Sequence, residues 1–73
     1  MDNEKQQSIK IIWYNFYYSL YANYKGYDFV IYKNTFILRI CILKNHSWST
    51  VMESEFKDIE SAKETAYSFC ERL

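Results

Sequence analysis

Residues 27–43 read YDFVIYKNTFILRICIL, a run dominated by β-branched and aromatic residues. Such side chains suit the pleated, half-buried surface of a β-strand. The Lys33-Asn34 pair within the run is short enough for a two-residue hairpin turn, although it lacks the favoured Gly. We therefore predict two antiparallel strands, Tyr27–Tyr32 and Thr35–Leu43, joined by this turn.

The side chains of these strands also predict how they pair. A turn at Lys33-Asn34 places Asp28 opposite Arg39, and opposite charges across a pair stabilise a sheet. A third strand is expected from about Trp48 to Glu53. A three-residue loop before it places Arg39 opposite Glu53, whereas a loop of two or four residues places Arg39 opposite Met52. We favour the first register, which predicts one apolar face made of Tyr27, Phe29, Ile31, Phe36, Leu38, Ile40, Ile42, Trp48, Thr50 and Met52.

Before this sheet, apolar residues recur at helical spacing. Their positions predict a helix from about residue 4 to about residue 24, with Asp2 or Asn3 as its N-cap. Gly26 then suits the left-handed position just past the helix C-terminus. The β-branched and aromatic residues from Ile11 to Tyr18 would also suit a strand. The predicted inner stripe of the helix is Ile9, Ile12, Trp13, Phe16, Tyr17, Leu20 and Tyr24.

The predicted first helix has a second aromatic stripe on its opposite side. At about 100° per residue, this stripe contains Ile11, Tyr14, Tyr18 and Tyr21. A surface helix normally has one apolar stripe and one polar face, and a chain of 73 residues has little material to cover both sides. We therefore predict that this stripe binds a partner, either a second copy of the chain or another protein. The alternative is that the helix is buried on both sides within one chain. Trp48, which lies beside a loop on an edge strand, is added to the predicted partner-binding residues.

A C-terminal helix completes the predicted fold. Asp58 is its expected N-cap and Glu60 lies in its first turn, where acidic residues are favourable. The expected fold class is α+β, with the order helix, three-stranded antiparallel meander, helix (α-β-β-β-α), and with both helices on one sheet face. The chain is expected to form one domain, residues 1–73. The inner stripe of the last helix is predicted to be Ile59, Ala62, Ala66, Phe69, Cys70 and Leu73.

Size and charge restrict the classes of function. Nine basic residues balance nine acidic ones, so the net basic character of most nucleic-acid binders is missing. Cys41 and Cys70 are expected on opposite sides of the sheet and so unbonded, and together with His46 they fall short of four zinc ligands. No 18-residue apolar run and no basic, apolar leader is present, which predicts a soluble cytoplasmic protein that uses no membrane, metal or cofactor.

The predicted order of elements, α-β-β-β-α, resembles the double-stranded RNA-binding domain over most of the chain. Residues 61–66, SAKETA, are also similar to the start of that family's second helix. The resemblance implies the same fold and, as an alternative function, nucleic-acid binding. The family's phosphate-binding lysine cluster is reduced to Lys57 and Lys63 among acidic residues, and Lys33-Asn34 replaces its Gly-Pro-x-His loop. Such lysines dominate affinity for RNA, so we do not expect a nucleic-acid partner.

A local match is carried by residues 25–32, KGYDFVIY, which resemble the RNP1 octamer of RNA-recognition motifs except at Asp28. In that family the aromatic rings stack on bases over an open sheet surface. No partner strand of the RNP2 type precedes the octamer. We therefore interpret Tyr27 and Phe29 as core residues.

No residue pattern predicts catalysis. His46-Ser47 is expected to form a polar hairpin loop, and Glu53/Glu55 and Asp58/Glu60 are expected to lie in solvent. The predicted function is a small non-catalytic protein-binding module, an inhibitor or adaptor that occludes a partner protein through an aromatic surface. Small size, neutral charge and abundant Tyr are typical of viral and mobile-element proteins of this kind. The expected partner is another protein, and a second copy of the chain is one candidate.

Overall fold

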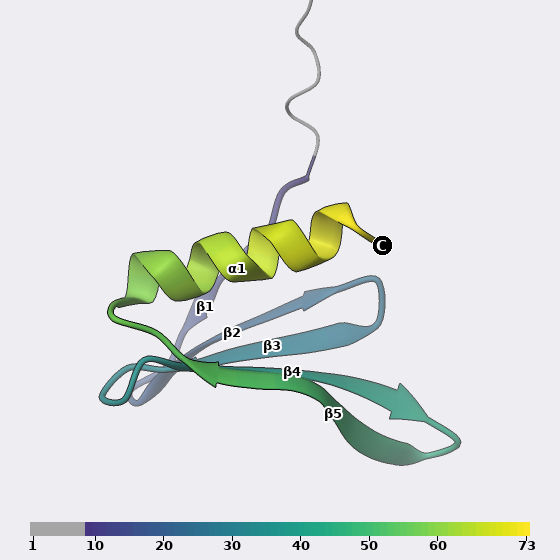
Figure 1. Cartoon of the computed structure of the whole chain (residues 1–73). Helices are drawn as coiled ribbons and strands as arrows, with labels where there is room; N and C mark the ends of the chain where they lie inside the picture. Colours follow the sequence, from purple (N-terminus) through teal and green to yellow (C-terminus); the bar gives the residue numbers. More distant parts are fainter. Residues whose placement is uncertain (1–8) are drawn as a thin grey trace, which may run out of the picture.

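The computed structural model describes residues 9–73, which form a five-stranded antiparallel sheet covered on one face by a C-terminal helix (Figure 1). The strands are β1 (Tyr14–Asn15), β2 (Ser19–Tyr24), β3 (Tyr27–Tyr32), β4 (Ile37–Lys44) and β5 (Ser47–Glu55), and the helix is α1 (Ile59–Glu71). Neighbours in sequence are neighbours in the sheet, in the order β1-β2-β3-β4-β5. The predicted α-β-β-β-α order, with its three-stranded meander and two helices on one face, is wrong.

Over residues 9–24, the predicted helix is replaced by extended chain. Residues 4–8 lie outside the described part, and residues 9–24 form an extended segment, β1 and β2. In β2, Leu20, Ala22 and Tyr24 face the core while Ser19, Tyr21 and Asn23 face away, which is the alternation of a half-buried strand. The free edge of β3 supplies backbone partners along the whole of β2. That pairing, together with the strand preference of β-branched and aromatic residues, outweighs the helical spacing.

Without a first helix, the resemblance to the double-stranded RNA-binding domain no longer holds. The chain lacks that family's element order, since five strands precede the helix in residues 9–73. The resemblance to the RNP1 octamer also loses its basis. Phe29 is fully buried, and both Tyr27 and Phe29 pack edge-on against the Phe69 ring of α1 at 5.2 and 5.9 Å between ring centroids. The interpretation of Tyr27 and Phe29 as core residues is therefore confirmed.

The β3–β4 hairpin keeps the predicted faces with a different register. The turn contains residues 33–36, and Phe36 adopts a positive φ of 58° while its N–H donates to Tyr32 O at 2.8 Å. Arg39 consequently lies opposite Val30, and Asp28 lies opposite Cys41, so the predicted Asp28–Arg39 pair is wrong. The register differs from the prediction by two residues, and an even shift leaves every side chain on its original face.

The β4–β5 hairpin contains a tighter turn than predicted and a β-bulge. Asn45 and His46 form the turn with φ values of 50° and 66°, so that Lys44 pairs with Ser47. An irregularity between Ile40 and Cys41 leaves Val51 as an extra residue on β5. The extra residue restores the predicted pairing of Arg39 with Glu53.

The same bulge separates the side chains of β5 between the two faces. Trp48 and Thr50 lie opposite Leu43 and Cys41, and so turn away from the helix. Met52, beyond the bulge, lies opposite Ile40 and keeps its predicted place in the helix-covered face. The expectation that Trp48, Thr50 and Met52 share one face is therefore wrong for the first two.

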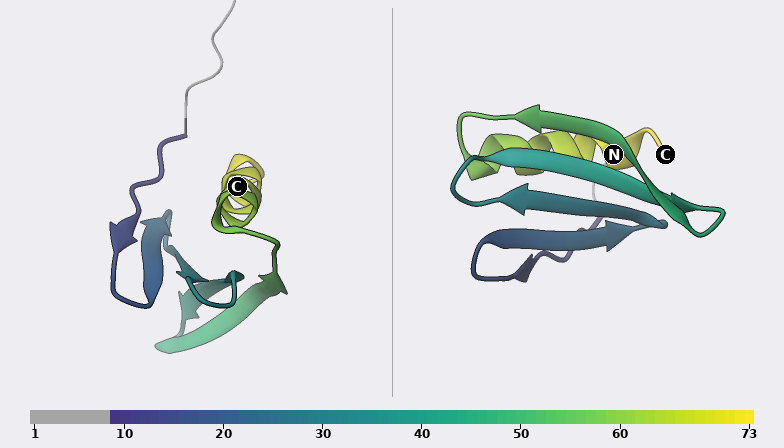
Figure 2. Two further views of the ribbon diagram at one scale, coloured as in Figure 1. Left: turned by 90° about the vertical axis from the view of Figure 1, so that its left-hand side faces the viewer. Right: turned by 90° about the horizontal axis from the view of Figure 1, so that it is seen from below.

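The core lies between α1 and the sheet, where α1 packs on β3 and β4 (Figure 2). Asp58 caps the helix as predicted, by accepting a hydrogen bond from Ser61 N–H at 2.8 Å. Of the predicted inner stripe, Leu73 lies beyond the helix end and is exposed.

Cys41 and Cys70 lie on opposite sides of the sheet as predicted, and burial raises the pKa of the Cys70 thiol. The buried residues are Ile11, Ala22, Phe29, Ile31, Leu38, Ile40, Ala62, Ala66 and Cys70.

Candidate protein interaction surface

Exposed aromatic and aliphatic side chains concentrate in residues 12–18, at the β1 edge of the sheet. Tyr17 and Tyr18 expose 84% and 70% of their surface, although both carry large rings. Exposed large apolar residues are ordinary when scattered singly, whereas a contiguous group marks an interaction site. We name this group the aromatic patch: Ile12, Tyr14, Phe16, Tyr17 and Tyr18.

Hydrogen bonds from two parts of the chain hold the backbone of the aromatic patch. Phe16 N–H donates to Ser19 O at 2.8 Å, which closes the turn between β1 and β2. Lys33, in the β3–β4 turn, donates from its backbone N–H to Tyr18 O at 2.9 Å. The Lys33 ammonium also donates to Phe16 O at 2.6 Å and to the side-chain oxygen of Asn15. These bonds tie the aromatic turn to the neighbouring turn, so its rings project from an anchored backbone.

Two rings of the aromatic patch contact each other, and a third contacts the adjacent strand β2. Tyr17 and Tyr18 pack edge-on with 4.5 Å between ring centroids, and Phe16 packs edge-on against Tyr21 at 6.5 Å. Edge-to-face contacts of this kind stabilise aromatic pairs beyond the area that they bury. These contacts restrict the positions of the rings, so the aromatic patch is partly ordered in the free chain.

The aromatic patch continues onto the open face of the sheet, the face away from α1 (Figure 2). The strand register aligns one residue from each strand in a row across this face, in the order Tyr14, Tyr21, Val30, Arg39 and Glu53. Tyr14 is exposed, while Tyr21, Val30 and Arg39 are half-buried. The row thus passes from aromatic at the β1 edge to charged at the β5 edge.

Polar contacts stabilise the open face. The Tyr21 hydroxyl and the Asn23 side-chain amide each donate to Asp28 Oδ1 at 2.7 Å. The hydrogen bond to Asp28 raises the pKa of the Tyr21 hydroxyl, because the bond holds its proton. Arg39 Nε lies 3.2 Å from Glu53 Oε1, and its guanidinium lies 5.6 Å from the centroid of the Tyr32 ring. These groups use one another as partners and give the face a defined arrangement.

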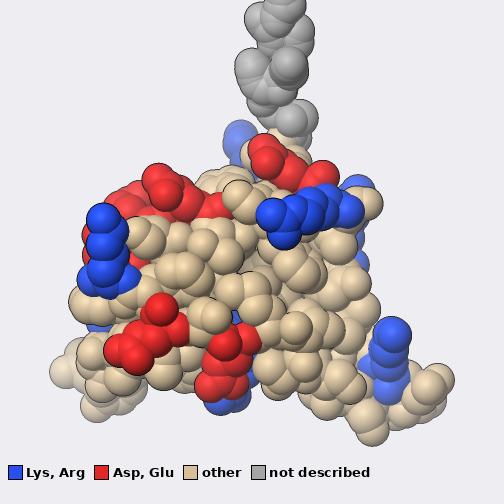
Figure 3. Space-filling view, viewed as in Figure 1, with Lys and Arg blue, Asp and Glu red and all other residues tan. Residues whose placement is uncertain are grey.

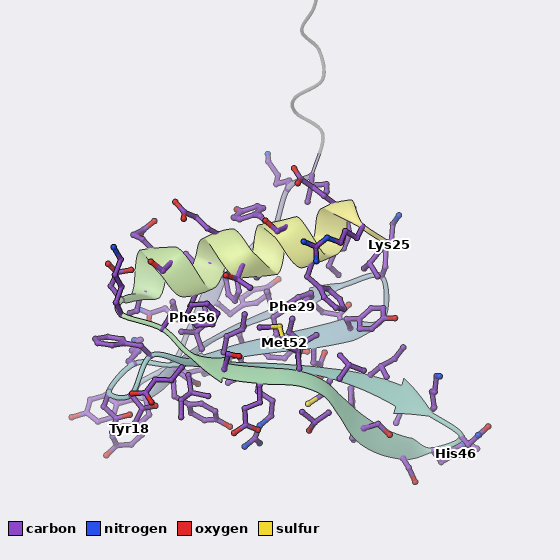
Figure 4. All side chains as sticks on the ribbon, viewed as in Figure 1. Tyr18, Lys25, Phe29, His46, Met52 and Phe56 are labelled. Atoms are coloured by element: carbon purple, nitrogen blue, oxygen red, sulfur yellow. The ribbon has the colours of Figure 1, made fainter. Side chains whose placement is uncertain are left out.

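A second exposed apolar group lies at the other end of the sheet. Leu43, Trp48 and Val51 are about half-exposed and surround the β4–β5 hairpin, which projects past α1 (Figure 1). Tyr18 and His46 mark the two opposite ends in Figure 4. Within residues 9–73, the exposed large apolar side chains other than Leu73 therefore form two separate groups.

The structure distributes the predicted partner-binding residues over three places. Ile11 is buried in the core, with only 6% of its surface exposed. Tyr14 and Tyr18 belong to the aromatic patch, and Tyr21 is half-buried beside it on the open face. Trp48 belongs to the distant β4–β5 hairpin.

Phe16 and Tyr17 are exposed members of the aromatic patch that the sequence reasoning assigned to the core. They were expected on the inner stripe of the first helix, which does not form. A signal was present in the sequence, because Phe16, Tyr17 and Tyr18 are consecutive. Neither a helix nor a strand can turn three consecutive side chains toward one core.

The residues considered for chemistry lie apart from one another. His46 occupies the exposed tip of the β4–β5 turn, Glu53 and Glu55 lie on the exposed edge strand, and Asp58 caps α1. Within residues 9–73, no three His, Cys, Asp or Glu side chains gather where they could hold a metal ion. The same part of the chain has no helix with the length and apolar character needed to cross a membrane.

Trp13 keeps its expected contact with the core in a different setting. Trp13 lies in the extended segment before β1 and packs against the buried cluster. The residue is half-exposed, but its indole nitrogen is buried. Among the described residues, Nε1 has no hydrogen-bond partner. Trp13 is thus a packing residue of the segment that leads into the aromatic patch.

Comparisons of the chain with protein-family models, with curated proteins and with solved structures found no match.

Proposed function

We propose that this chain is a small protein-binding module without a catalytic role, an inhibitor or adaptor that covers part of another protein through the aromatic patch. The observation that carries the proposal is the exposure of five neighbouring large side chains in a chain that buries few. Leaving these side chains in water forgoes a stabilisation of about 25 cal/mol per Å² of apolar surface. Binding to a complementary surface would recover it.

The composition of the aromatic patch suits a protein partner. Tyr combines a large apolar ring with a hydroxyl that remains satisfied at a wet rim, and few rotatable bonds are fixed when it binds. Three of the five residues are Tyr. Aromatic residues are enriched at the energetic centres of protein interfaces, whereas phosphate-binding surfaces need an excess of Lys and Arg.

The anchored turn favours binding for a second reason. A surface that is already ordered loses less conformational entropy when a partner docks. The backbone at Phe16 and Tyr18 is held by hydrogen bonds to Ser19 and Lys33. The aromatic patch therefore resembles a preorganised docking site.

The proposal is tested by introducing charge at the two most exposed rings. We expect Tyr17→Asp combined with Tyr18→Asp to abolish partner capture, because two buried carboxylates would lack counter-ions in the interface. The measurement is a pull-down from cells of the native source with the full chain as bait, followed by quantitative mass spectrometry. Circular dichroism should show an unchanged fold, since both side chains lie largely in solvent.

Leu43→Asp is the matched control for this pair. Leu43 is also exposed on the sheet but lies on the β4–β5 hairpin, far from the aromatic patch. It should leave capture intact. Capture that survives the double substitution but fails with Leu43→Asp would move the site to the hairpin and reject the aromatic patch.

A second copy of the chain is one partner that the test must recognise. If the aromatic patch pairs with itself, sedimentation equilibrium should show a dimer that the double substitution converts to a monomer. Salt-sensitive binding to duplex RNA that the double substitution leaves unchanged would instead contradict a protein-binding role.

A further inference from the structure

A groove with a volume of about 350 Å³ runs between α1 and the edge strand β5. It lies at the opposite edge of the sheet from the aromatic patch, so it is independent of the function proposed above. α1 packs mainly on β3 and β4, and Met52 on the inner face of β5 is only half-buried beside it. The groove is lined by Met52, Glu64, Thr65, Ser68, Phe69 and Arg72.

The groove has an apolar floor and opposite charges along its helical wall. Met52 of β5, labelled in Figure 4, and Phe69 of α1 are half-buried and supply the floor. Glu64, Ser68 and Arg72 follow one another every four residues along α1, so Glu64 and Arg72 are separated by about 12 Å at 1.5 Å per residue. Figure 3 shows an uncharged area between α1 and β5 with charged side chains above and below it.

β5 offers a row of backbone groups beside this groove. Within residues 9–73, β5 (Ser47–Glu55) pairs on one side only, with β4. The other side presents backbone N–H and C=O groups that can pair with a further extended chain. The bulge at Val51 interrupts the regular edge, which limits pairing to a short segment on the C-terminal side of the bulge. Met52 lies on that side, next to the groove.

We propose that this edge binds a short extended peptide, which adds to β5 as a sixth strand and inserts one apolar side chain between Met52 and Phe69. Strand addition of this type draws affinity from backbone hydrogen bonds and specificity from alternate side chains. The charges of the groove set the direction and the ends of the peptide. The occupant is a peptide with a free C-terminal carboxylate.

The direction follows from the fold. α1 runs back in the direction opposite to β5, so a peptide antiparallel to β5 runs parallel to α1, from Glu64 toward Arg72 (Figure 1). The C-terminal carboxylate then lies near the Arg72 guanidinium, and the last two residues of the peptide run past the bulge without pairing with β5. About 12 Å corresponds to roughly four residues of strand at 3.4 Å each. A Lys or Arg four positions before the C-terminus therefore faces Glu64, and an apolar residue two positions before it faces Met52 and Phe69.

The test uses a synthetic heptapeptide, acetyl-Thr-Thr-Lys-Thr-Leu-Thr-Ala with a free carboxylate, titrated into the isotope-labelled full chain. We expect amide shifts by NMR in residues 51–55 and 64–72, with an affinity in the range of about 1 mM or tighter for a peptide of this size. The absence of shifts at about 5 mM peptide would overturn the proposal, because a dissociation constant near 1 mM gives most of the full shift there.

Backbone modification separates strand addition from simple apolar contact. Two peptides are compared. In one, N-methylation blocks the backbone N–H groups that point toward β5; in the other, it blocks the N–H groups that point away from β5. We expect one set to abolish binding and the other to leave it, since alternate N–H groups point to opposite sides of a strand. Equal binding by both peptides would exclude strand addition.

Charge reversal tests the direction of the peptide. Arg72→Glu, or amidation of the peptide C-terminus, should each weaken binding by about threefold or more, and the two changes together should weaken it little further. Glu71→Lys is the matched control on the same helix, because Glu71 does not line the groove. An Arg72→Glu chain that binds the free and amidated peptides as tightly as the unmodified chain would contradict this arrangement. Concentration-dependent shifts of β5 without peptide would assign the edge to a second copy and would also overturn it.

Discussion

The turn between β2 and β3 shows how a single residue shapes the sheet. Lys25 and Gly26 adopt φ values of 51° and 85°, and both lie in the left-handed region that two-residue hairpin turns require. Gly reaches this region without steric penalty, whereas a Lys does not. A left-handed Gly26 was expected from the sequence, but at the end of a helix. A Gly in a hairpin turn adopts the same left-handed conformation as a Gly at a helix end. The presence of Gly26 alone therefore did not distinguish a helix from a strand before it.

We expect Gly26→Ala to destabilise the chain by about 1 kcal/mol, the cost of a left-handed residue with a Cβ. A Cβ at this position meets no atom within 4 Å, so backbone conformation alone accounts for the loss. Urea unfolding monitored by circular dichroism measures it. Lys25→Asn is the control and should raise stability slightly, because Asn tolerates the left-handed region. Equal stability of Gly26→Ala and the unmodified chain would show that the turn is not of this type.

At the scale of elements, α1 is the segment whose sequence and structure agree best. It has an N-cap, an acidic first turn and a stripe of small apolar residues that faces the sheet. The hydrogen bond from Ser61 N–H holds the pKa of the Asp58 carboxyl below its ordinary value, because the bond favours the charged form. A carboxyl with a lowered pKa stabilises the fold above its unfolded pKa and loses that contribution as pH falls through its folded pKa.

This linkage predicts the acid behaviour of two variants. Asp58→Ala should lower the urea midpoint at neutral pH, because the helix loses its cap. Asp58→Asn should retain much of the cap. It should also make the urea midpoint less dependent on pH below 3.8, the ordinary pKa of an Asp carboxyl. Urea midpoints measured from neutral to acidic pH test both expectations. A pH dependence as steep in Asp58→Asn as in the unmodified chain would assign the acid transition to other carboxyls.

The two edge strands differ in how they avoid uncontrolled pairing. β1 has only two residues, whereas β5 has nine but carries a bulge, Glu53 and Glu55. Short edges, bulges and charges all discourage edge-to-edge aggregation. Both edges are thus restricted to short partners, and the two proposals follow this limit: contact through side chains at the aromatic patch, and through a few backbone groups at the β5 groove.

At the scale of the whole molecule, one layer of helix on one sheet leaves little material for the core. The largest fully buried side chains are Phe29, Ile31, Leu38 and Ile40, all from the two central strands β3 and β4. A chain of this size buries a smaller share of its surface than a larger domain and is only marginally stable. The core therefore depends on a few residues that contact several elements at once.

Phe29 is the residue on which this dependence can be measured. It has no exposed surface and contacts Phe69 of α1 across the core. Phe29→Ala should destabilise the chain by about 3–5 kcal/mol, comparable with the total stability of a small domain. Circular dichroism at ambient temperature should therefore show a largely unfolded population. Phe29→Leu, the control that keeps most of the apolar volume, should remain folded. A folded Phe29→Ala chain with an unchanged urea midpoint would reject this account of the core.

Part of the molecule follows from local sequence patterns. The strand at Tyr27–Tyr32 and the Asp58-capped helix were predicted and are present, because each depends on neighbours in sequence. The Arg39–Glu53 pair was also predicted, but it forms because the bulge at Val51 offsets a turn one residue shorter than expected. The faces of β3 and β4 were also predicted correctly despite the wrong turn length. An error of two residues in register is invisible to a pattern that repeats every two residues.

Only the tertiary structure decided the conformation of residues 9–24 and therefore the candidate site. Their apolar residues fit both a helix and a strand, and the choice depends on pairing with the free edge of β3, which the apolar spacing of residues 9–24 does not reveal. Once β2 pairs there, Ile11 enters the core while Phe16 and Tyr17 emerge into solvent. The identity of the exposed aromatic residues is thus a consequence of the pairing of β2 with β3, and not of the periodicity of the segment itself.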